Sequence, residues 1–368
     1  MQQNKACSNP ECKVFDKYIL PFEAKFCPMC GTELYNTHNY KIISKLRNNF
    51  YLRYFGGHVD GMVPIVRNDK IGFINYMGQE VIPCVFDETF GFTEGLAPVL
   101  FNEKWGCVDM SGKVAIPFKY DQITNFHQGI ACVYKDHRFG WIDRTGKQLI
   151  HNEYPWGGDY YNGIINTVNR FSENVAIDIN ENIILKFPAK YDVVTTPFSC
   201  GLAVVTDANT GLEGYVNIDG EEVIPCRFET ACTFEKGTLN NYARVKTNSG
   251  WAVIDQFGKV ILSGIFPNYI KPYNNKFYTN HYGCALVYRV MSNTKRAELV
   301  ATIDGVEFTY EWLKNGYMVA KKDGKYGVLD NDYLEALPFI YDNIQVFENT
   351  DTVIAELKSD GLFYIIRF

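Results

Sequence analysis

Four cysteines lie within the first thirty residues, at spacings that could hold a metal ion. Four residues separate Cys7 from Cys12, and after fourteen further residues two residues separate Cys27 from Cys30. Each close pair can present two thiolates from one turn, and two such pairs complete the tetrahedral all-sulfur site that Zn²⁺ favours. Because a closed four-thiolate site leaves no position for water, we expect one zinc ion with a structural role.

The second pair stands in the sequence Phe26-Cys-Pro-Met-Cys-Gly31. This stretch resembles the zinc-ribbon family, whose second knuckle commonly reads C-P-x-C-G. The first pair departs from the family, because two residues between the cysteines are commoner than four, so its turn could be a wider loop. A segment this short cannot fold on an apolar core alone, and metal binding would supply most of its stability. We therefore predict a zinc ribbon at residues 1–38, followed by a linker or first strands at 39–60.

The other seven cysteines are scattered singly, and several stand inside apolar runs, which is typical of small buried side chains. An odd total of eleven without a secretory signal argues against a disulfide framework and for a reducing, cytoplasmic location. These seven are Cys84, Cys107, Cys132, Cys200, Cys226, Cys232 and Cys284.

From residue 61 onward the chain repeats an aromatic or apolar residue followed by glycine, here called the aromatic–glycine step. Trp105-Gly106 is the clearest copy, and Gly72 and Gly140 lie 34 residues to either side of Gly106. Each step is followed by a hairpin glycine and, in most copies, by the letters I-P and a late phenylalanine. Further copies contain Gly214, Trp251 followed by alanine, and Tyr326-Gly327.

These residues resemble the WG-repeat family (tryptophan–glycine repeats), and the resemblance covers residues 61–368 as about eight repeats plus a partial one. The family is defined by its repeat and shares no single reaction. The resemblance therefore implies an interaction module, often joined to other small domains, and not an enzyme.

One repeat can be divided into strands without reference to the family. Residues 95–101, 105–109 and 114–117 are separated by turn residues, and residues 122–124 can add a short fourth strand. Such a sheet cannot bury both faces alone, so neighbouring repeats must stack into a continuous core. We expect an all-β fold, either a propeller-like ring or an open β-superhelix. We favour the propeller, because strands near residues 40–58 could complete the partial repeat at the other end of the chain.

The composition agrees with this fold class and excludes others. The chain has 26 Phe, 25 Tyr, 5 Trp and 30 Gly, which favour pleated strands and tight turns. No apolar run is long enough for a transmembrane helix, and no phosphate-binding, dinucleotide or hydrolase motif occurs. A net charge of -6 argues against non-specific nucleic-acid binding.

Acidic residues recur at two positions of the repeat. The first set follows the late aromatic residue and could bind cations or a basic partner, or could accept backbone N–H bonds in a turn; it comprises Asp87, Asp121, Asp192, Glu229 and Asp342. The second set precedes the hairpin glycine, and turn formation explains it; it comprises Asp109, Asp143, Asp255 and Asp330.

The repeat is broken near residues 154–161 and 266–282, where aromatic residues replace its usual pattern. Loops that leave a rigid scaffold often carry binding residues, although such insertions can also simply pack over a degenerate repeat. The candidate partner-binding residues are Tyr154, Trp156, Tyr160, Tyr161, Tyr269, Tyr273, Phe277 and Tyr278.

Three functions fit these observations. The first is a non-catalytic scaffold that combines a zinc ribbon with a repeat platform and binds another protein. The second is a nucleic-acid-associated protein, which the neutral charge of residues 1–34 disfavours. The third is a glycan-active enzyme with paired carboxylates among the repeat acids. The sequence leaves the partner and the oligomeric state open.

Overall fold

The structure is a computed structural model, and every regular element in its described part is a β-strand. It describes residues 4–7, 34–37, 41–47, 51–52, 61–192, 194, 196–236, 241–263, 270–273, 276–291, 296–347, 350–359 and 361–368. Within these residues there is no helix long and apolar enough to cross a membrane.

The strands near the two ends of the chain form four antiparallel sheets. A two-stranded sheet contains β1 (Asn4–Cys7) and β2 (Leu34–Thr37). A second sheet contains β4 (Tyr51–Leu52), β5 (Met62–Arg67), β6 (Lys70–Asn75) and β7 (Glu80–Phe86). A third contains β31 (Val306–Trp312), β32 (Met318–Lys322), β33 (Lys325–Leu329) and β34 (Glu335–Tyr341). The fourth has the order β3 (Lys41–Arg47), β37 (Leu362–Arg367), β36 (Thr352–Leu357) and β35 (Asn343–Phe347).

Six further antiparallel sheets lie between these in the sequence. The first two contain β8 (Glu88–Thr89), β9 (Leu96–Phe101), β10 (Lys104–Asp109) and β11 (Val114–Tyr120), then β12 (Gln122–Ile123), β13 (Ile130–Lys135), β14 (Arg138–Asp143) and β15 (Gln148–Tyr154). The next two contain β16 (Trp156–Tyr161), β17 (Ile164–Val168), β18 (Asn174–Ile177) and β19 (Ile183–Lys186), then β20 (Leu202–Thr206), β21 (Glu213–Asn217) and β22 (Glu222–Phe228). The last two contain β23 (Thr230–Ala231), β24 (Tyr242–Thr247), β25 (Gly250–Asp255) and β26 (Val260–Ser263), then β27 (Lys271–Tyr273), β28 (Lys276–His281), β29 (Cys284–Val290) and β30 (Ala297–Asp304).

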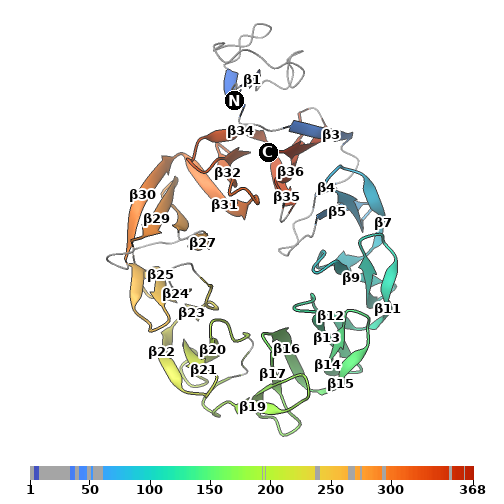
Figure 1. Cartoon of the computed structure of the whole chain (residues 1–368), viewed down its shortest axis with the longest axis vertical. Helices are drawn as coiled ribbons and strands as arrows, with labels where there is room; N and C mark the ends of the chain where they lie inside the picture. Colours follow the sequence, from blue (N-terminus) through green and yellow to red (C-terminus); the bar gives the residue numbers. More distant parts are fainter. Residues whose placement is uncertain are drawn as a thin grey trace. The chain divides into compact units, whose positions relative to one another are not determined.

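In the described part of the chain, nine sheets therefore have three or four strands and a simple up-and-down order, as the blades of a β-propeller do. The expected all-β fold is confirmed, and of the two arrangements considered it is the β-propeller. The last blade is built from both ends of the sequence, because β3 pairs with β37 through Lys41↔Arg367 and Ile42↔Ile366. Figure 1 shows β3 beside the C-terminus. The prediction that strands near residues 40–58 complete the terminal repeat is thus confirmed.

The sequence repeat and the blade are offset from each other. We predicted residues 122–124 as the fourth strand of the repeat that starts at Gly95, and this assignment was wrong. Gln122 and Ile123 pair instead with Tyr134 and Val133 of the following strand, β13. The chain has already passed to the next sheet at this point, so this blade takes its first strand from the end of the preceding repeat.

The glycine of the aromatic–glycine step is required by a bulge in the neighbouring strand. Gly106 lies at a shift in the register of β10 with β11, which occurs between Trp105 and Cys107. A Cβ atom on Gly106 would lie 2.6 Å from the carbonyl oxygen of Ile116 and 2.7 Å from the ring of Phe118. The same backbone approach occurs at four other steps, Gly72, Gly140, Gly214 and Gly327. Only glycine lets the two backbones come this close.

The blade that carries alanine at this position has a smaller irregularity. Ala252 pairs with Ser263, and β25 and β26 show a single register shift, between Val253 and Ile254. The partner strand therefore does not bulge towards residue 252, and a Cβ atom is accommodated there. Alanine after Trp251 and glycine after Trp105 therefore have the same physical cause, because the position of the neighbouring strand's backbone decides whether a Cβ atom fits.

The contacts divide the chain into two compact units, Met1–Gly91 with Gly283–Ala285 and Ile303–Phe368, and Phe92–Tyr282 with Leu286–Thr302. In each unit the apolar faces of successive blades pack on one another, as expected for stacked repeats. The late phenylalanines predicted to build this core are all buried: Phe92, Phe126, Phe198, Phe234 and Phe347.

Candidate functional site

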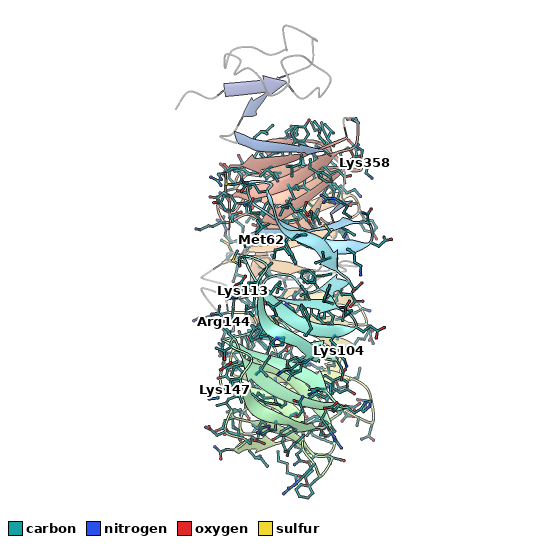
Figure 2. All side chains as sticks on the ribbon, turned by 90° about the vertical axis from the view of Figure 1, so that its right-hand side faces the viewer. Met62, Lys104, Lys113, Arg144, Lys147 and Lys358 are labelled. Atoms are coloured by element: carbon teal, nitrogen blue, oxygen red, sulfur yellow. The ribbon has the colours of Figure 1, made fainter. Side chains whose placement is uncertain are left out.

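In the second unit, the turns that precede β9, β13, β17 and β20 in successive blades share one conformation. Each has a residue in the left-handed region followed by a glycine with φ near 80°. The four non-glycine residues are Glu94 (φ 51°), Gln128 (φ 52°), Asn162 (φ 51°) and Cys200 (φ 54°). In an antiparallel blade, the turn after the third strand lies at this same end. Figure 2 shows Lys113, Arg144 and Lys147, from such turns, along one edge of the blades and Lys104 along the other.

Hydrogen bonds join the first three of these turns into what we call the turn ladder. The carboxylate of Glu94 accepts bonds from the backbone amides of Gln128 (2.6 Å) and Gly129 (2.8 Å). The Gln128 side chain donates to Asn162 Oδ1 (2.9 Å) and accepts from the Asn162 amide (2.7 Å). Each long polar side chain thus satisfies backbone groups of the next blade's turn.

The turn ladder stops at Cys200. Its short thiol lies 3.9 Å from the carbonyl oxygen of Phe234, and the adjacent Ser199 hydroxyl donates to that same oxygen at 2.6 Å. The turn of the next blade is also longer, with Glu235 and Tyr242 exchanging two backbone hydrogen bonds of 2.7 and 3.0 Å. A short side chain beside a widened turn leaves space that the earlier blades fill.

This space, here called the turn hollow, has a volume of about 800 Å³, within the range of small-ligand sites. Its lining combines the partly exposed Tyr161 with residues that carry hydroxyl, amide, thiol and charged groups. The lining residues are Tyr161, Asn162, Pro197, Ser199, Cys200, Thr233, Phe234, Glu235, Lys236 and Asn241.

The lining offers binding groups rather than catalytic pairs. It includes one carboxylate, Glu235, and the paired carboxylates of a glycosidase would need a second. Cys200 has no histidine beside it among the described lining residues, so a thiolate–imidazole pair is not formed there. The described residues also contain no group of three metal-ligating side chains.

The first predicted partner-binding stretch is only partly brought to the turn hollow. Tyr161 lines it. Tyr154 instead packs edge-on against Trp141 at 5.4 Å and donates its hydroxyl to Glu181 at 2.8 Å. Tyr160 packs against the buried cluster that contains Trp141, while Trp156 is half-buried in β16.

The second predicted stretch contributes mainly to the core. Phe277 is fully buried and contacts Tyr242 edge-on at 5.3 Å, and Tyr278 is 5% exposed. Tyr273 is the last residue of β27. Tyr269 lies outside the described residues.

The repeat acids of the first set are structural in the blades where their contacts are seen. Three pair with the lysine that starts the third strand of a blade (β6, β10 or β33): Lys70–Asp87, Lys104–Asp121 (2.6 Å) and Lys325–Asp342 (2.6 Å). Glu229 pairs instead with Lys246, near the end of the second strand β24, at 3.3 Å. The hydrogen bond from Lys104 holds the pKa of Asp121 below its usual value. Asp192 is the member of the set without such a lysine pair in the described residues.

The second set of acids behaves as predicted. The Asp109 carboxylate accepts bonds from the backbone amides of Ser111 and Lys113, and the Ser111 hydroxyl bonded to it lowers its pKa. Asp143, Asp255 and Asp330 accept the same two backbone bonds in their turns.

Of the predicted zinc ligands, Cys12, Cys27 and Cys30 lie outside the described residues. Cys7 is the last residue of β1, where it pairs with Leu34 of β2. The antiparallel pairing of β1 with β2 therefore brings Cys7 opposite a residue four positions after Cys30.

Sequence reasoning missed Cys200, Ser199, Thr233 and Lys236. A signal for them was present, because Cys200 stands directly before a repeat glycine where the three preceding repeats have Glu, Gln and Asn. The meaning of that departure depends on a hydrogen-bond ladder between repeats, which one repeat considered alone does not reveal.

Comparison with known proteins agrees with the fold and the repeat. The sequence profile of the family described as "WG containing repeat" matches residues 71–105, 105–136 and 214–251, so the chain carries WG repeats at these places. No curated protein sequence matches it. A solved structure titled "Crystal structure of the eukaryotic initiation factor" is similar with a TM-score of 0.55 at 10% identity, covering 87% of this chain and 94% of that one. BamB from Moraxella catarrhalis gives a TM-score of 0.39 at 13% identity, covering 90% and 100% of the two chains. At 10% identity, the similarity to the initiation-factor structure concerns the fold alone.

Proposed function

We propose that this protein is a non-catalytic interaction scaffold, in which a structural zinc ribbon accompanies a WG-repeat platform that binds another protein. The observation that carries the proposal is the break in the turn ladder at Cys200. A repeat fold makes the same contacts at each position unless a copy diverges, and here divergence produces a polar hollow beside three turns that share one pattern of hydrogen bonds. Binding residues commonly collect at such departures from a rigid scaffold.

The chemistry of the turn hollow supports binding without reaction. Tyr161 and Pro197 supply apolar contact area, while Ser199, Thr233 and Asn162 supply hydrogen-bonding groups. Aromatic groups beside polar ones are typical of protein-recognition surfaces. The seven cysteines from Cys84 to Cys284 are free thiols, which fits a reducing, cytoplasmic location.

The prediction of a zinc ribbon is supported by the cysteine spacing and by the pairing of β1 with β2. This pairing brings together the two strands between which the other three cysteines lie in the sequence. We expect metal analysis of the purified protein to find one zinc ion per chain, lost when Cys27 and Cys30 are changed to serine. Finding no zinc in the wild-type protein would contradict this part of the proposal.

The platform is tested by capturing interacting proteins with the intact chain and with three variants. Cys200→Gln should reduce capture, because a glutamine here can fill the turn hollow in the way that Gln128 fills the preceding turn. The matched control is Phe171→Ala, since Phe171 is 68% exposed in the turn at the other end of β17. A third variant lacking residues 1–38 shows whether the N-terminal segment also takes part.

A partner identified by mass spectrometry and then purified should bind the wild-type chain and Phe171→Ala equally, and Cys200→Gln less. Equal binding by the wild type, Phe171→Ala and Cys200→Gln would show that the partner binds elsewhere than at the turn hollow. Absence of any reproducible partner would contradict the proposed function itself.

A further inference from the structure

The charges that line the turn hollow are unbalanced. Glu235 is already engaged, because its carboxylate accepts a hydrogen bond of 3.2 Å from the Arg244 guanidinium, whose side chain is 11% exposed. Lys236 is exposed, and among the described residues no carboxylate lies within ion-pair distance of its ammonium group. The hollow therefore presents one uncompensated positive charge.

This arrangement differs from that of the repeat lysines. Lys104 and Lys246 each hold a carboxylate of the chain itself at 2.6 and 3.3 Å. Those pairs complete the repeat, and the cation is satisfied before any partner arrives. Lys236 stands in the widened turn, outside the repeat pattern, so its charge is available to a partner.

The lining also contains hydrogen-bond donors besides this cation. The Asn162 side chain uses its oxygen in the turn ladder, and its Nδ2 group donates to no described residue. The hydroxyls of Tyr161 and Thr233 likewise have no hydrogen-bond partner among the described residues. A site with several donors and one cation is complementary to a ligand rich in acceptors and negative in charge.

We propose that the turn hollow binds a short extended peptide segment of a partner protein through an aspartate or glutamate side chain that pairs with Lys236. This inference rests on the proposed function and specifies the chemistry of the partner. Backbone carbonyls of the peptide would accept from Asn162 and Thr233, and an apolar neighbour of the acidic residue would contact Tyr161 or Pro197.

The same charges disfavour a nucleic acid in this position. A polynucleotide presents a row of phosphates and needs several cations to neutralise them. The lining instead contains a single lysine and a carboxylate, Glu235, on a chain whose net charge is -6.

The test is a phage-displayed library of random linear nonapeptides, selected on the full-length protein. Fusion to the coat protein blocks the peptide's own carboxyl end, so any required carboxylate must come from Asp or Glu. Recovered peptides are synthesised, and their affinities are measured for the wild type, Lys236→Glu and Lys259→Glu. Lys259 is exposed in the turn between β25 and β26, outside the lining, so Lys259→Glu makes the same charge change elsewhere.

We expect the recovered peptides to share an acidic position and to slow alkylation of Cys200, which places them in the turn hollow. Lys236→Glu should weaken their binding at least about tenfold, as expected for loss of a charge-assisted hydrogen bond, while Lys259→Glu should leave it within about twofold. Peptides that protect Cys200 but share no acidic position, or bind Lys236→Glu equally well, would overturn the inference and leave the proposed function standing. If no peptide protects Cys200, or if single-stranded RNA protects it instead, the peptide site is refuted.

Discussion

Changing Gly106 to alanine tests the physical reason for the aromatic–glycine step. The new Cβ atom would lie 2.6 Å from the Ile116 carbonyl oxygen, whereas ordinary contacts begin near 3.4 Å. The two strands would have to separate by about 0.8 Å, or the bulge in β11 would have to rearrange. Both adjustments occur between buried side chains, since Cys107 and Ile116 are fully buried.

The sign of the effect distinguishes this explanation from simple strand propensity. Overpacking of a tight site costs about 1–3 kcal/mol, and here the contact is with backbone, which places the cost at the upper end. The lower entropy of an unfolded chain with alanine offsets about 0.4–1 kcal/mol of this. We therefore expect Gly106→Ala to lower the free energy of unfolding by about 2 kcal/mol, whereas propensity alone would raise it.

The assay is urea unfolding followed by tryptophan fluorescence, together with amide hydrogen exchange measured by mass spectrometry to localise the change to β10 and β11. Ala252→Gly is the matched control in the blade with the smaller irregularity. It should destabilise the protein by about 1 kcal/mol, through the lost methyl group and the added backbone freedom. A stabilising or neutral Gly106→Ala, measured beside the expected loss for Ala252→Gly, would refute the close-approach explanation.

Three other predictions concern an ion pair, the thiols and the last blade. Lys104 lowers the pKa of Asp121. Their pair therefore stabilises the fold above the unfolded carboxylate pKa of about 3.9, and this contribution is lost as pH falls through the lower folded pKa. The difference in unfolding free energy between wild type and Lys104→Met should accordingly shrink between pH 7 and pH 3 in parallel urea titrations. Burial raises the pKa of the Cys107 thiol, so a maleimide should label half-buried Cys200 in the folded protein and Cys107 only after unfolding, as peptide mapping would show; labelling of both at equal rates would contradict the burial. Removing residues 1–50 deletes β3 and bares the edge of β37, so this truncation should aggregate in size-exclusion chromatography, whereas removal of residues 1–38 should leave a soluble, folded chain.

The sequence predicted those features of the fold that each repeat contains within itself. Hairpin turns such as the one at Asp109 are local, because the carboxylate bonds to amides two and four residues later. Burial of Phe126 and its counterparts follows from their recurrence at one position of the repeat. The joining of β3 to β37 was also predictable, since the last repeat lacks strands that the start of the chain can supply.

Features that depend on a partner strand or on a neighbouring blade were harder to predict. The assignment of Gln122 to the wrong blade arose because its spacing is the same whichever sheet it joins. The candidate site shows a similar limit: aromatic residues at a broken repeat can face a hollow, as Tyr161 does, or fill a core, as Phe277 does. The face of the strand on which a side chain lies, and the neighbouring blade that covers this face, decide between these outcomes. Neither can be inferred from the stretch of sequence alone.

The most direct test of the scaffold function is site-specific photo-crosslinking in living cells. A benzophenone amino acid placed at Tyr161, in the lining of the turn hollow, should form a discrete crosslink to one partner protein. The same group at exposed Phe171, at the opposite end of β17, should not form that crosslink. Crosslinks of equal yield to the same partner from both positions, or from neither, would contradict the turn hollow as the place where this protein binds.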